Sequence, residues 1–167
     1  MATIRDSVAA DAQAIARIYN HYIRESIATF EEVEIDAAEI ARRMEAVKRQ
    51  YSWLVAQEQD EVVGYAYASA WHARAAYRYS VETSVYLDPA CCGRGIGTVL
   101  YEEMLKRLRG MPVRLAIGGV SLPNEASVRL HEKTGFKKAA HYEQVGYKFN
   151  RWIDVGYWQL QLPYEPA

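Results

Sequence analysis

Residues Cys91 to Leu108 read CCGRGIGTVLYEEMLKRL, and this stretch decides how the chain folds. Gly93, Gly95 and Gly97 stand at alternate positions. Glycine has no Cβ, so the backbone can turn tightly here and can approach a ligand closely. The stretch therefore predicts a loop whose backbone faces a bound molecule.

A helix is predicted to begin inside this loop. Apolar residues recur at every fourth position in Ile96, Leu100, Met104 and Leu108, and Gly110 is placed to end the helix. The β-branched and aromatic segment SVETSVYL at 80–87 predicts a strand before the loop. A strand, a glycine loop and a helix start direct free N–H groups and the positive helix end at one point, which suits a phosphate.

The spacing of the glycines narrows the choice of phosphate ligand. A dinucleotide loop needs G-x-G-x-x-G, and a Walker loop needs Lys before Ser or Thr. The chain has G-x-G-x-G followed by Thr98, so both matches are poor. The loop resembles the pyrophosphate-binding loop of the GNAT acetyltransferase superfamily, Q/R-x-x-G-x-G/A, with Cys92 in the place of Gln or Arg. The alternative is a plain glycine turn that caps a surface helix.

Composition indicates one domain spanning residues 1–167, long enough to bury a core. The net charge is −1, from 20 basic and 21 acidic residues, which argues against nucleic acid or an anionic membrane as the main partner. No apolar stretch approaches the ~20 residues of a membrane span, and no signal peptide opens the chain, so we expect a cytoplasmic protein. Cys91 and Cys92 are adjacent, which fits neither a disulfide framework nor a zinc site, and no metal is expected.

The remaining patterns predict a mixed α/β order, β-α-α-β-β-β-α-β-α-β-β. Strands are expected at 3–5, 53–57, 62–69, 79–87, 113–120, 138–144 and 152–162. Helices are expected at 11–26, with Asp11 as its cap, at 37–50, at 96–109 and at 124–134, with Gly135 ending the last of these.

The helix expected at 124–134 carries a polar stripe. Asn124, Ser127 and His131 are spaced i, i+3 and i+7, so they share one face. Beside the glycine loop, this stripe favours a polar ligand. The alternative is that Asn124 only caps the helix and His131 is a surface histidine.

Four separated motifs give a more specific resemblance. They look like the phosphinothricin N-acetyltransferase branch of the GNAT superfamily and cover nearly the whole chain: IYNHY at 18–22, VETSVY at 81–86, LPNEASVRLHEKTGF at 122–136 and VGYKFNRWIDVG at 145–156. The resemblance implies an α/β (α+β) GNAT fold, with a mixed, mostly antiparallel twisted sheet that splays at its central strands. It also implies acetyl-CoA as donor and, as acceptor, the α-amine of a small amino-acid analogue such as phosphinothricin, methionine sulfoximine or methionine sulfone.

The same resemblance implies roles for individual residues. The pantetheine arm is expected on Val85, Tyr86 and Leu87, and Asn124 and Ser127 are expected to contact the cofactor from the opposite side. The pyrophosphate is expected on the loop residues Gly93, Arg94, Gly95, Ile96, Gly97 and Thr98. A backbone N–H near Val85 would stabilise the oxyanion.

Proton transfer points to two further residues. An amine attacks a thioester only when it is neutral, so a base is needed, and Glu82 is the first candidate. Glu82 precedes Val85 by three positions and faces the other side of the strand unless a bulge intervenes, as the superfamily leads us to expect. His131 stands where most of the superfamily has tyrosine, and it is an acid, a base or a hydrogen-bond partner of a water. The alternative for Glu82 is a solvated strand carboxylate.

The acceptor is expected to contact Phe30, Arg74 and Tyr77. The guanidinium of Arg74 suits a carboxylate, although a surface position explains this arginine equally well.

Two other functions stay open, a module that senses acyl-CoA without turning it over and an acetyltransferase of protein N-termini or lysines. Glu82 and His131 favour the enzyme. An enclosed aromatic pocket of Phe30, Trp71 and Tyr77 would argue against protein acceptors.

The final strand has apolar residues on both faces, of which one needs cover. Since related enzymes are commonly homodimers, we expect a homodimer.

Overall fold

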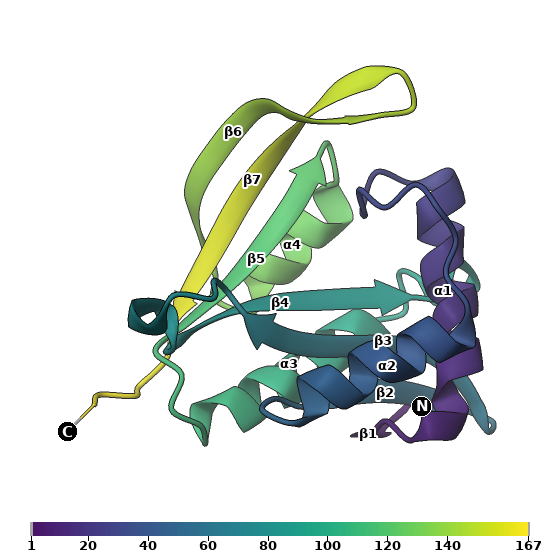
Figure 1. Cartoon of the computed structure of the whole chain (residues 1–167), viewed down its shortest axis with the longest axis horizontal. Coiled ribbons are helices and arrows are strands. Elements are labelled where there is room, and N and C mark those ends of the chain that lie inside the picture. The colour runs from purple at the N-terminus through teal and green to yellow at the C-terminus, as the bar shows by residue number, and fades with distance from the viewer. Residues whose placement is uncertain (1, 167) are drawn as a thin grey trace.

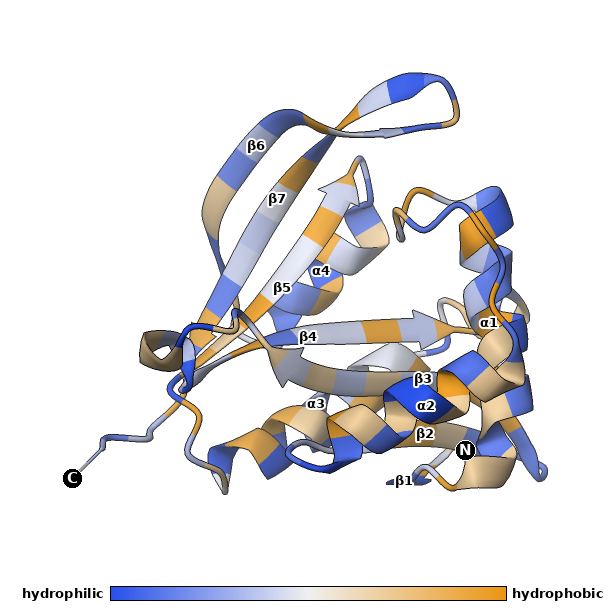
Figure 2. Ribbon diagram, viewed as in Figure 1, coloured by the Kyte–Doolittle hydropathy of each residue, from blue (hydrophilic) through white to orange (hydrophobic). Residues whose placement is uncertain are grey.

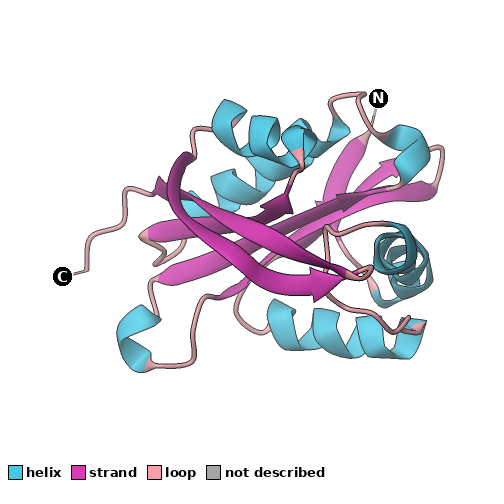
Figure 3. Cartoon of the chain, turned by 90° about the horizontal axis from the view of Figure 1, so that it is seen from above, coloured by secondary structure: helices cyan, strands magenta, loops and turns pink. Residues whose placement is uncertain are grey.

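The computed structural model describes residues 2–166 and consists of one seven-stranded sheet with helices on both sides (Figures 1 and 3). The strand order is β1-β2-β3-β4-β5-β7-β6, and every neighbouring pair is antiparallel except β4 and β5. The strands are β1 (Thr3–Asp6), β2 (Trp53–Glu58), β3 (Glu61–Ala70), β4 (Ser80–Leu87), β5 (Leu115–Leu122), β6 (Lys137–Lys148) and β7 (Arg151–Gln161). The helices are α1 (Ala12–Glu25), α2 (Ala37–Lys48), α3 (Ile96–Arg109) and α4 (Glu125–Lys133), with short 3-10 turns η1 (Ala9–Asp11), η2 (Ala75–Tyr77) and η3 (Pro89–Cys91).

This order confirms the predicted α/β fold class and the predicted sequence of elements. The element boundaries lie within two residues of the prediction except at the end of β6, which continues to Lys148. The prediction that Asp11 caps α1 is wrong for its side chain. The Asp11 carboxylate makes no cap hydrogen bond and instead pairs with Arg5 at 2.8 Å and accepts from the N–H of Val8 at 2.7 Å.

Helices cover both faces of the sheet, because successive side chains of a strand point to opposite faces and both sets are apolar. Along β2, Trp53 and Val55 pack against α1 and α2, whereas Leu54 and Ala56 pack against α3. All four side chains are buried. Figure 2 shows hydrophobic and hydrophilic residues interchanging along β7, whereas β5 carries hydrophobic and near-neutral residues.

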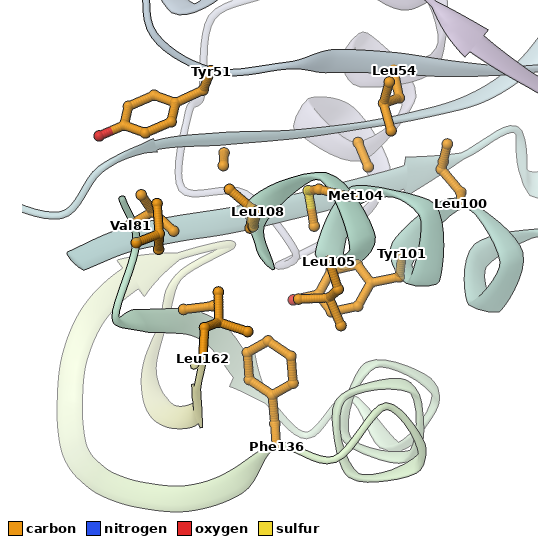
Figure 4. Close-up of a cluster of buried hydrophobic side chains, with 14 of the residues drawn as sticks. Tyr51, Leu54, Val81, Leu100, Tyr101, Met104, Leu105, Leu108, Phe136 and Leu162 are labelled. Carbon is orange, nitrogen blue, oxygen red and sulfur yellow. The ribbon is translucent and has the colours of Figure 1, made fainter. Parts of the chain in front are cut away.

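The α3 face holds the larger core. Leu100, Met104 and Leu108 are buried at the predicted helical spacing, and Tyr101 and Leu105 point toward Phe136 and Leu162 (Figure 4). This packing fixes α3 along its length. Its N-terminus, which follows the glycine loop, is therefore held at a defined place at the end of β4.

The sheet divides between β4 and β5 (Figure 1). These two strands pair in parallel only where Ser80–Glu82 lies beside Leu115–Ile117. Beyond this point the hydroxyl of Thr83 donates to the carbonyl oxygen of Ile117 at 3.1 Å, a side-chain bond at the place where the ladder ends. The expected bulge is wrong, because β3 and β4 pair one to one from Ala70–Val81 to Gly64–Leu87.

Candidate active site

The divided strands enclose a cavity of about 920 Å³, a size typical of small-molecule sites. Its lining comes from parts of the chain that are far apart in sequence: β4, the glycine loop, the end of β5, α4 and the segment Ser26–Phe30 after α1. Because β4 and β5 have separated here, part of the backbone edge of each strand faces this space. Backbone N–H and C=O groups in such a place require partners.

The glycine loop forms one end of the cavity. Gly93 and Gly95 have φ of 77° and 80°, values that strain any residue with a side chain. A Cβ built at either position has no protein atom within 4 Å, so both face open space. Gly95 is also the N-cap of α3, whose first turn leaves backbone N–H groups without helical acceptors. The loop is therefore a cradle for an anion.

The structure brings together most, but not all, of the loop residues expected to hold a cofactor. Gly97 and Thr98 line the cavity. The side chain of Arg94 instead forms an ion pair with Glu58 at 2.8 Å, and that of Ile96 is buried in the core. Within residues 2–166, these two are outside the lining set, so any contribution from Arg94 or Ile96 would come from the backbone.

Val85, Tyr86 and Leu87 border the cavity along β4, as predicted from the resemblance. The Tyr86 ring leaves this edge and packs edge-on against Tyr19, with ring centroids 5.2 Å apart. Its hydroxyl donates to the carbonyl of Ala28 at 3.3 Å. The backbone, rather than the Tyr86 side chain, is what β4 offers to a ligand arm.

The polar stripe of α4 also borders the cavity. Asn124 is the N-cap, and its side chain accepts from the N–H of Ser127 at 3.1 Å. Asn124, Ser127 and His131 all belong to the cavity lining. The capping role and the ligand-facing role of Asn124 therefore coexist.

His131 is buried, with 3 % of its surface exposed, so the alternative of a surface histidine is wrong. Its Nδ1 lies 2.8 Å from the carbonyl oxygen of Ser127, which can only accept, so Nδ1 carries the proton. Nε2 lies 2.9 Å from the Tyr101 hydroxyl and accepts from it. Burial lowers the pKa of His131, and the Ser127 carbonyl opposes this shift only in part. The imidazole is therefore neutral at pH 7.

Two residues that support His131 were missed from the sequence. The Tyr101 hydroxyl donates to Nε2, so it accepts from the Thr83 hydroxyl 2.6 Å away, and the single Thr83 proton is shared between Tyr101 and the carbonyl oxygen of Ile117. These contacts link α4 through α3 to β4. Tyr101 lies in the core-facing row of α3. A buried tyrosine needs a partner for its hydroxyl, and this was the available signal.

Gly118 and Gly119 of β5 lie next to the two titratable side chains, His131 and Glu82. A Cβ at Gly118 would lie 2.0 Å from Nε2 of His131, and a Cβ at Gly119 would lie 3.4 Å from Oε1 of Glu82 and 3.1 Å from the Tyr157 ring. Adjacent residues of a strand face opposite sides. Any side chain at Gly118 would displace His131, whereas at Gly119 the tight contact would be with the Tyr157 ring and Glu82 would lie at van der Waals distance.

Glu82 is half-buried and lines the cavity. Burial raises the pKa of its carboxyl group, and the nearby His72 opposes the shift. A carboxylate with a raised pKa in a cavity is a better proton acceptor than a solvated one. The fully solvated alternative is therefore wrong for Glu82.

The three residues expected to contact an acceptor are separated. Phe30 lines the cavity, but among residues 2–166 neither Arg74 nor Tyr77 belongs to the lining. Arg74 precedes the turn η2, and the Tyr77 ring packs on His72 at 5.0 Å. The role of Arg74 stays a prediction. The wall on this side is instead Tyr157, which the sequence did not single out.

Across the part of the chain that the structure describes, no group of three or more His, Cys, Asp or Glu side chains is placed to hold a metal ion. In the same residues, no helix is both long enough and apolar enough to cross a membrane.

The tautomer of His131 is a testable consequence of this geometry. At pH 7, ¹⁵N NMR should show a protonated Nδ1 and an unprotonated Nε2, with a titration midpoint below the usual 6.5. The unfolded chain binds this proton at higher pH than the folded chain does. The contribution of His131 to stability is therefore present above pH 6.5 and is lost as the pH falls through the folded pKa.

Tyr101→Phe keeps the ring and removes the hydroxyl, so the Nε2 resonance should shift in that variant. Tyr51→Phe removes a hydroxyl elsewhere in the core and is the matched control. A protonated Nε2 at pH 7 in the unmodified protein would contradict this assignment.

Comparison with known proteins agrees with this site. Residues 4–156 match the family model of the acetyltransferase (GNAT) domain. The chain is 38 % identical to phosphinothricin N-acetyltransferase of Streptomyces viridochromogenes, over 98 % of this chain and 90 % of the relative. It is also 38 % identical to the L-methionine sulfoximine/L-methionine sulfone acetyltransferase of Salmonella typhimurium, over 96 % of this chain and 94 % of the relative.

Solved structures agree as well. A phosphinothricin acetyltransferase from Sinorhizobium meliloti in complex with acetyl-CoA has a TM-score of 0.94 and 37 % identity, and the match covers 96 % of this chain and 88 % of that one. Ribosomal-protein-alanine N-acetyltransferase from Brucella melitensis has a TM-score of 0.94 and 34 % identity, and the match covers 96 % of this chain and 99 % of that one. The chain therefore belongs to the GNAT family of acetyl-CoA-dependent N-acetyltransferases.

Proposed function

We propose that this enzyme transfers the acetyl group of acetyl-CoA to the α-amine of a small amino-acid analogue of the phosphinothricin and methionine sulfoximine class. The observation that carries the proposal is one cavity that contains both the glycine loop and the half-buried carboxylate of Glu82. The names of the relatives supply the acceptor class. A module that only senses acyl-CoA has no need of Glu82.

The proposed binding mode of acetyl-CoA, the acetyl donor, follows from the residues that line the cavity. Gly93–Thr98 hold the pyrophosphate through backbone N–H groups and the positive end of α3. The open edge of β4 at Val85–Leu87 binds the pantetheine arm, and Asn124 and Ser127 contact it from α4. Glu82 lies near the start of β4 and the glycine loop follows its end, so an arm laid along β4 from the loop brings the thioester toward Glu82.

The reaction then needs one proton transfer before attack and one after it. Glu82 accepts a proton from the acceptor ammonium, and the neutral amine attacks the thioester carbonyl. The new C–N bond leaves the carbonyl oxygen as an oxyanion, which a backbone N–H near Val85 stabilises. The C–S bond breaks, and the departing thiolate of CoA takes up the proton that the nitrogen loses as the amide forms. His131 lines the same cavity. Its role as an acid, a base or the hydrogen-bond partner of a water stays a prediction.

Protein N-termini are the second candidate acceptor. The similarity to the Brucella melitensis ribosomal-protein-alanine N-acetyltransferase favours it. Against it, the segment Ser26–Phe30 and Tyr157 border the acceptor end of the cavity, which suits a compact molecule better than a peptide.

A panel of acceptors tests the proposal. Release of free CoA thiol should be rapid with phosphinothricin, methionine sulfoximine or methionine sulfone, and slow with a peptide that begins with alanine. Mass spectrometry should place the acetyl group on the α-amine. Preferred turnover of the peptide would replace the proposed acceptor by the second candidate.

In the same assay, Arg74→Lys should raise the acceptor KM if the guanidinium binds the carboxylate.

Glu82→Gln should lower kcat by ~10²–10⁴ and leave the affinity for acetyl-CoA nearly unchanged, because the amide cannot accept the proton. The base must be ionised, and its pKa is raised by burial. Activity of the unmodified enzyme should therefore fall as the pH drops through a midpoint above the usual 4.5 of glutamate. Glu102→Gln on the exposed side of α3 is the control. An acidic limb that survives in Glu82→Gln would assign the base elsewhere.

We also propose that the enzyme is a homodimer. Five large apolar side chains of the β6–β7 hairpin are about half exposed or more: Tyr142, Val145, Tyr147, Phe149 and Trp152. Such a patch needs cover, and a second copy of the chain would supply it. Light scattering should give twice the chain mass of 19.0 kDa, and Trp152→Asp should shift the mass toward one chain. A single-chain mass for the unmodified protein would contradict the dimer.

A further inference from the structure

Lys148, the last residue of β6, is a buried lysine that lies outside the cavity lining. Only 2 % of its surface is exposed. Its Nζ donates to the carbonyl oxygens of Ser26 at 2.7 Å, Thr29 at 2.8 Å and Tyr22 at 3.3 Å. An ammonium group has three N–H donors, so each has a backbone acceptor.

Burial of an ammonium group is unfavourable unless it is fully hydrogen-bonded. Burial lowers the pKa of Lys148, and Glu32 opposes the shift. The carbonyl of Tyr22 belongs to the last turn of α1, and Ser26 is the C-cap of that helix. The negative end of the helix dipole therefore faces the ammonium and favours its charged form. The lysine closes α1 and binds the segment that follows it.

A second residue of β6 contacts the same segment. A Cβ at Gly146 would lie 2.4 Å from the Phe30 ring, so the backbone of Gly146 lies directly against that ring. Gly146 and Lys148 are two positions apart, so they face the same side of the strand. The hairpin in Figure 1 leans toward the chain that follows α1, and these two residues are its points of contact.

The segment that Lys148 binds is a wall of the cavity. Ser26, Ile27, Ala28, Thr29 and Phe30 all line it. The segment has two other anchors, the Tyr86 hydroxyl on Ala28 and the Tyr19 hydroxyl 2.7 Å from Oγ1 of Thr29. Both of these come from the body of the domain. Among the described residues of the hairpin, Lys148 is the one that hydrogen-bonds the carbonyls at both ends of the turn, Ser26 and Thr29.

We propose that Lys148 is a positioning residue for the acceptor: its ammonium group holds Ser26–Phe30 in place as the acceptor wall, and so sets acceptor affinity without contact to acceptor or cofactor. This inference rests on the proposed function, because it assumes that the acceptor occupies the end of the cavity away from the glycine loop. Within residues 2–166, Lys148 makes no hydrogen bond to the glycine loop or to β4, and its link to the donor end is indirect, through Tyr22, whose hydroxyl donates to the carbonyl of Leu87 at 2.7 Å.

Lys148→Met tests the inference, because methionine fills much of the same space and donates no hydrogen bond. Loss of the donor leaves buried carbonyls unpaired and frees the wall, so the acceptor KM should rise about tenfold or more. The affinity for acetyl-CoA, measured by calorimetry, should change less than about twofold, and kcat should fall less than KM rises. Lys137→Met on the exposed start of the same strand is the matched control.

Hydrogen exchange reports on the wall without any turnover. Backbone amides of 26–30 should exchange faster in Lys148→Met than in Lys137→Met, whereas those of 93–98 should not. Unchanged exchange, or faster exchange with an unchanged acceptor KM, overturns the inference. If the proposed function is wrong, the unmodified enzyme would instead prefer the alanine peptide as acceptor. The KM for that peptide, compared between Lys148→Met and Lys137→Met, would then decide the role of Lys148.

If Lys148→Met does not fold, the unmodified protein still decides the question. With CoA present, saturating N-acetylated product should slow exchange of the 26–30 amides several-fold. Exchange that is indifferent to the product overturns the inference.

Discussion

The separation of β4 from β5 is the constraint on which the rest of the site depends. The two strands share only a short parallel ladder, and beyond it each presents an open backbone edge. Unpaired N–H and C=O groups are costly when no partner satisfies them, so this edge needs water or a ligand and is available to bind one. The glycine loop, the first turn of α3 and the start of α4 are then grouped around one opening, because all three follow β4 or β5 in the chain.

Strand β5 acts as a partition between two chemical environments. On one side the neutral His131 is held by Ser127 and Tyr101, in a buried hydrogen-bonded chain. On the other side Glu82 lies in the cavity with a raised pKa. The pair Gly118–Gly119 allows both groups to lie close to one strand while backbone separates them. The two titratable residues named from the sequence thus have different surroundings, which is how one fold assigns them different proton affinities.

The sequence predicted what depends on local signals. The strand at 80–87, the glycine loop, the periodic helix α3 and the Asn124 cap each follow from a short stretch, and the structure has all four. Prediction was wrong where a distant partner decides. Asp11 pairs with Arg5 rather than capping α1, and the division of the sheet needs no bulge beside β3. Tyr101 and Lys148 were missed for the same reason, since their partners lie far away in sequence.

The link between Lys148 and the end of α1 joins residues 119 to 126 positions apart. Such a contact closes nearly the whole chain into a loop, and non-local contacts of this kind form late in folding. The cofactor end, by contrast, is built from one stretch between β4 and α4. During synthesis, all residues from β4 to α4 are therefore made before the final hairpin. The wall at Ser26–Phe30 has its third anchor only after that hairpin has been made and has docked, so completion of this side of the cavity waits for the last part of the chain.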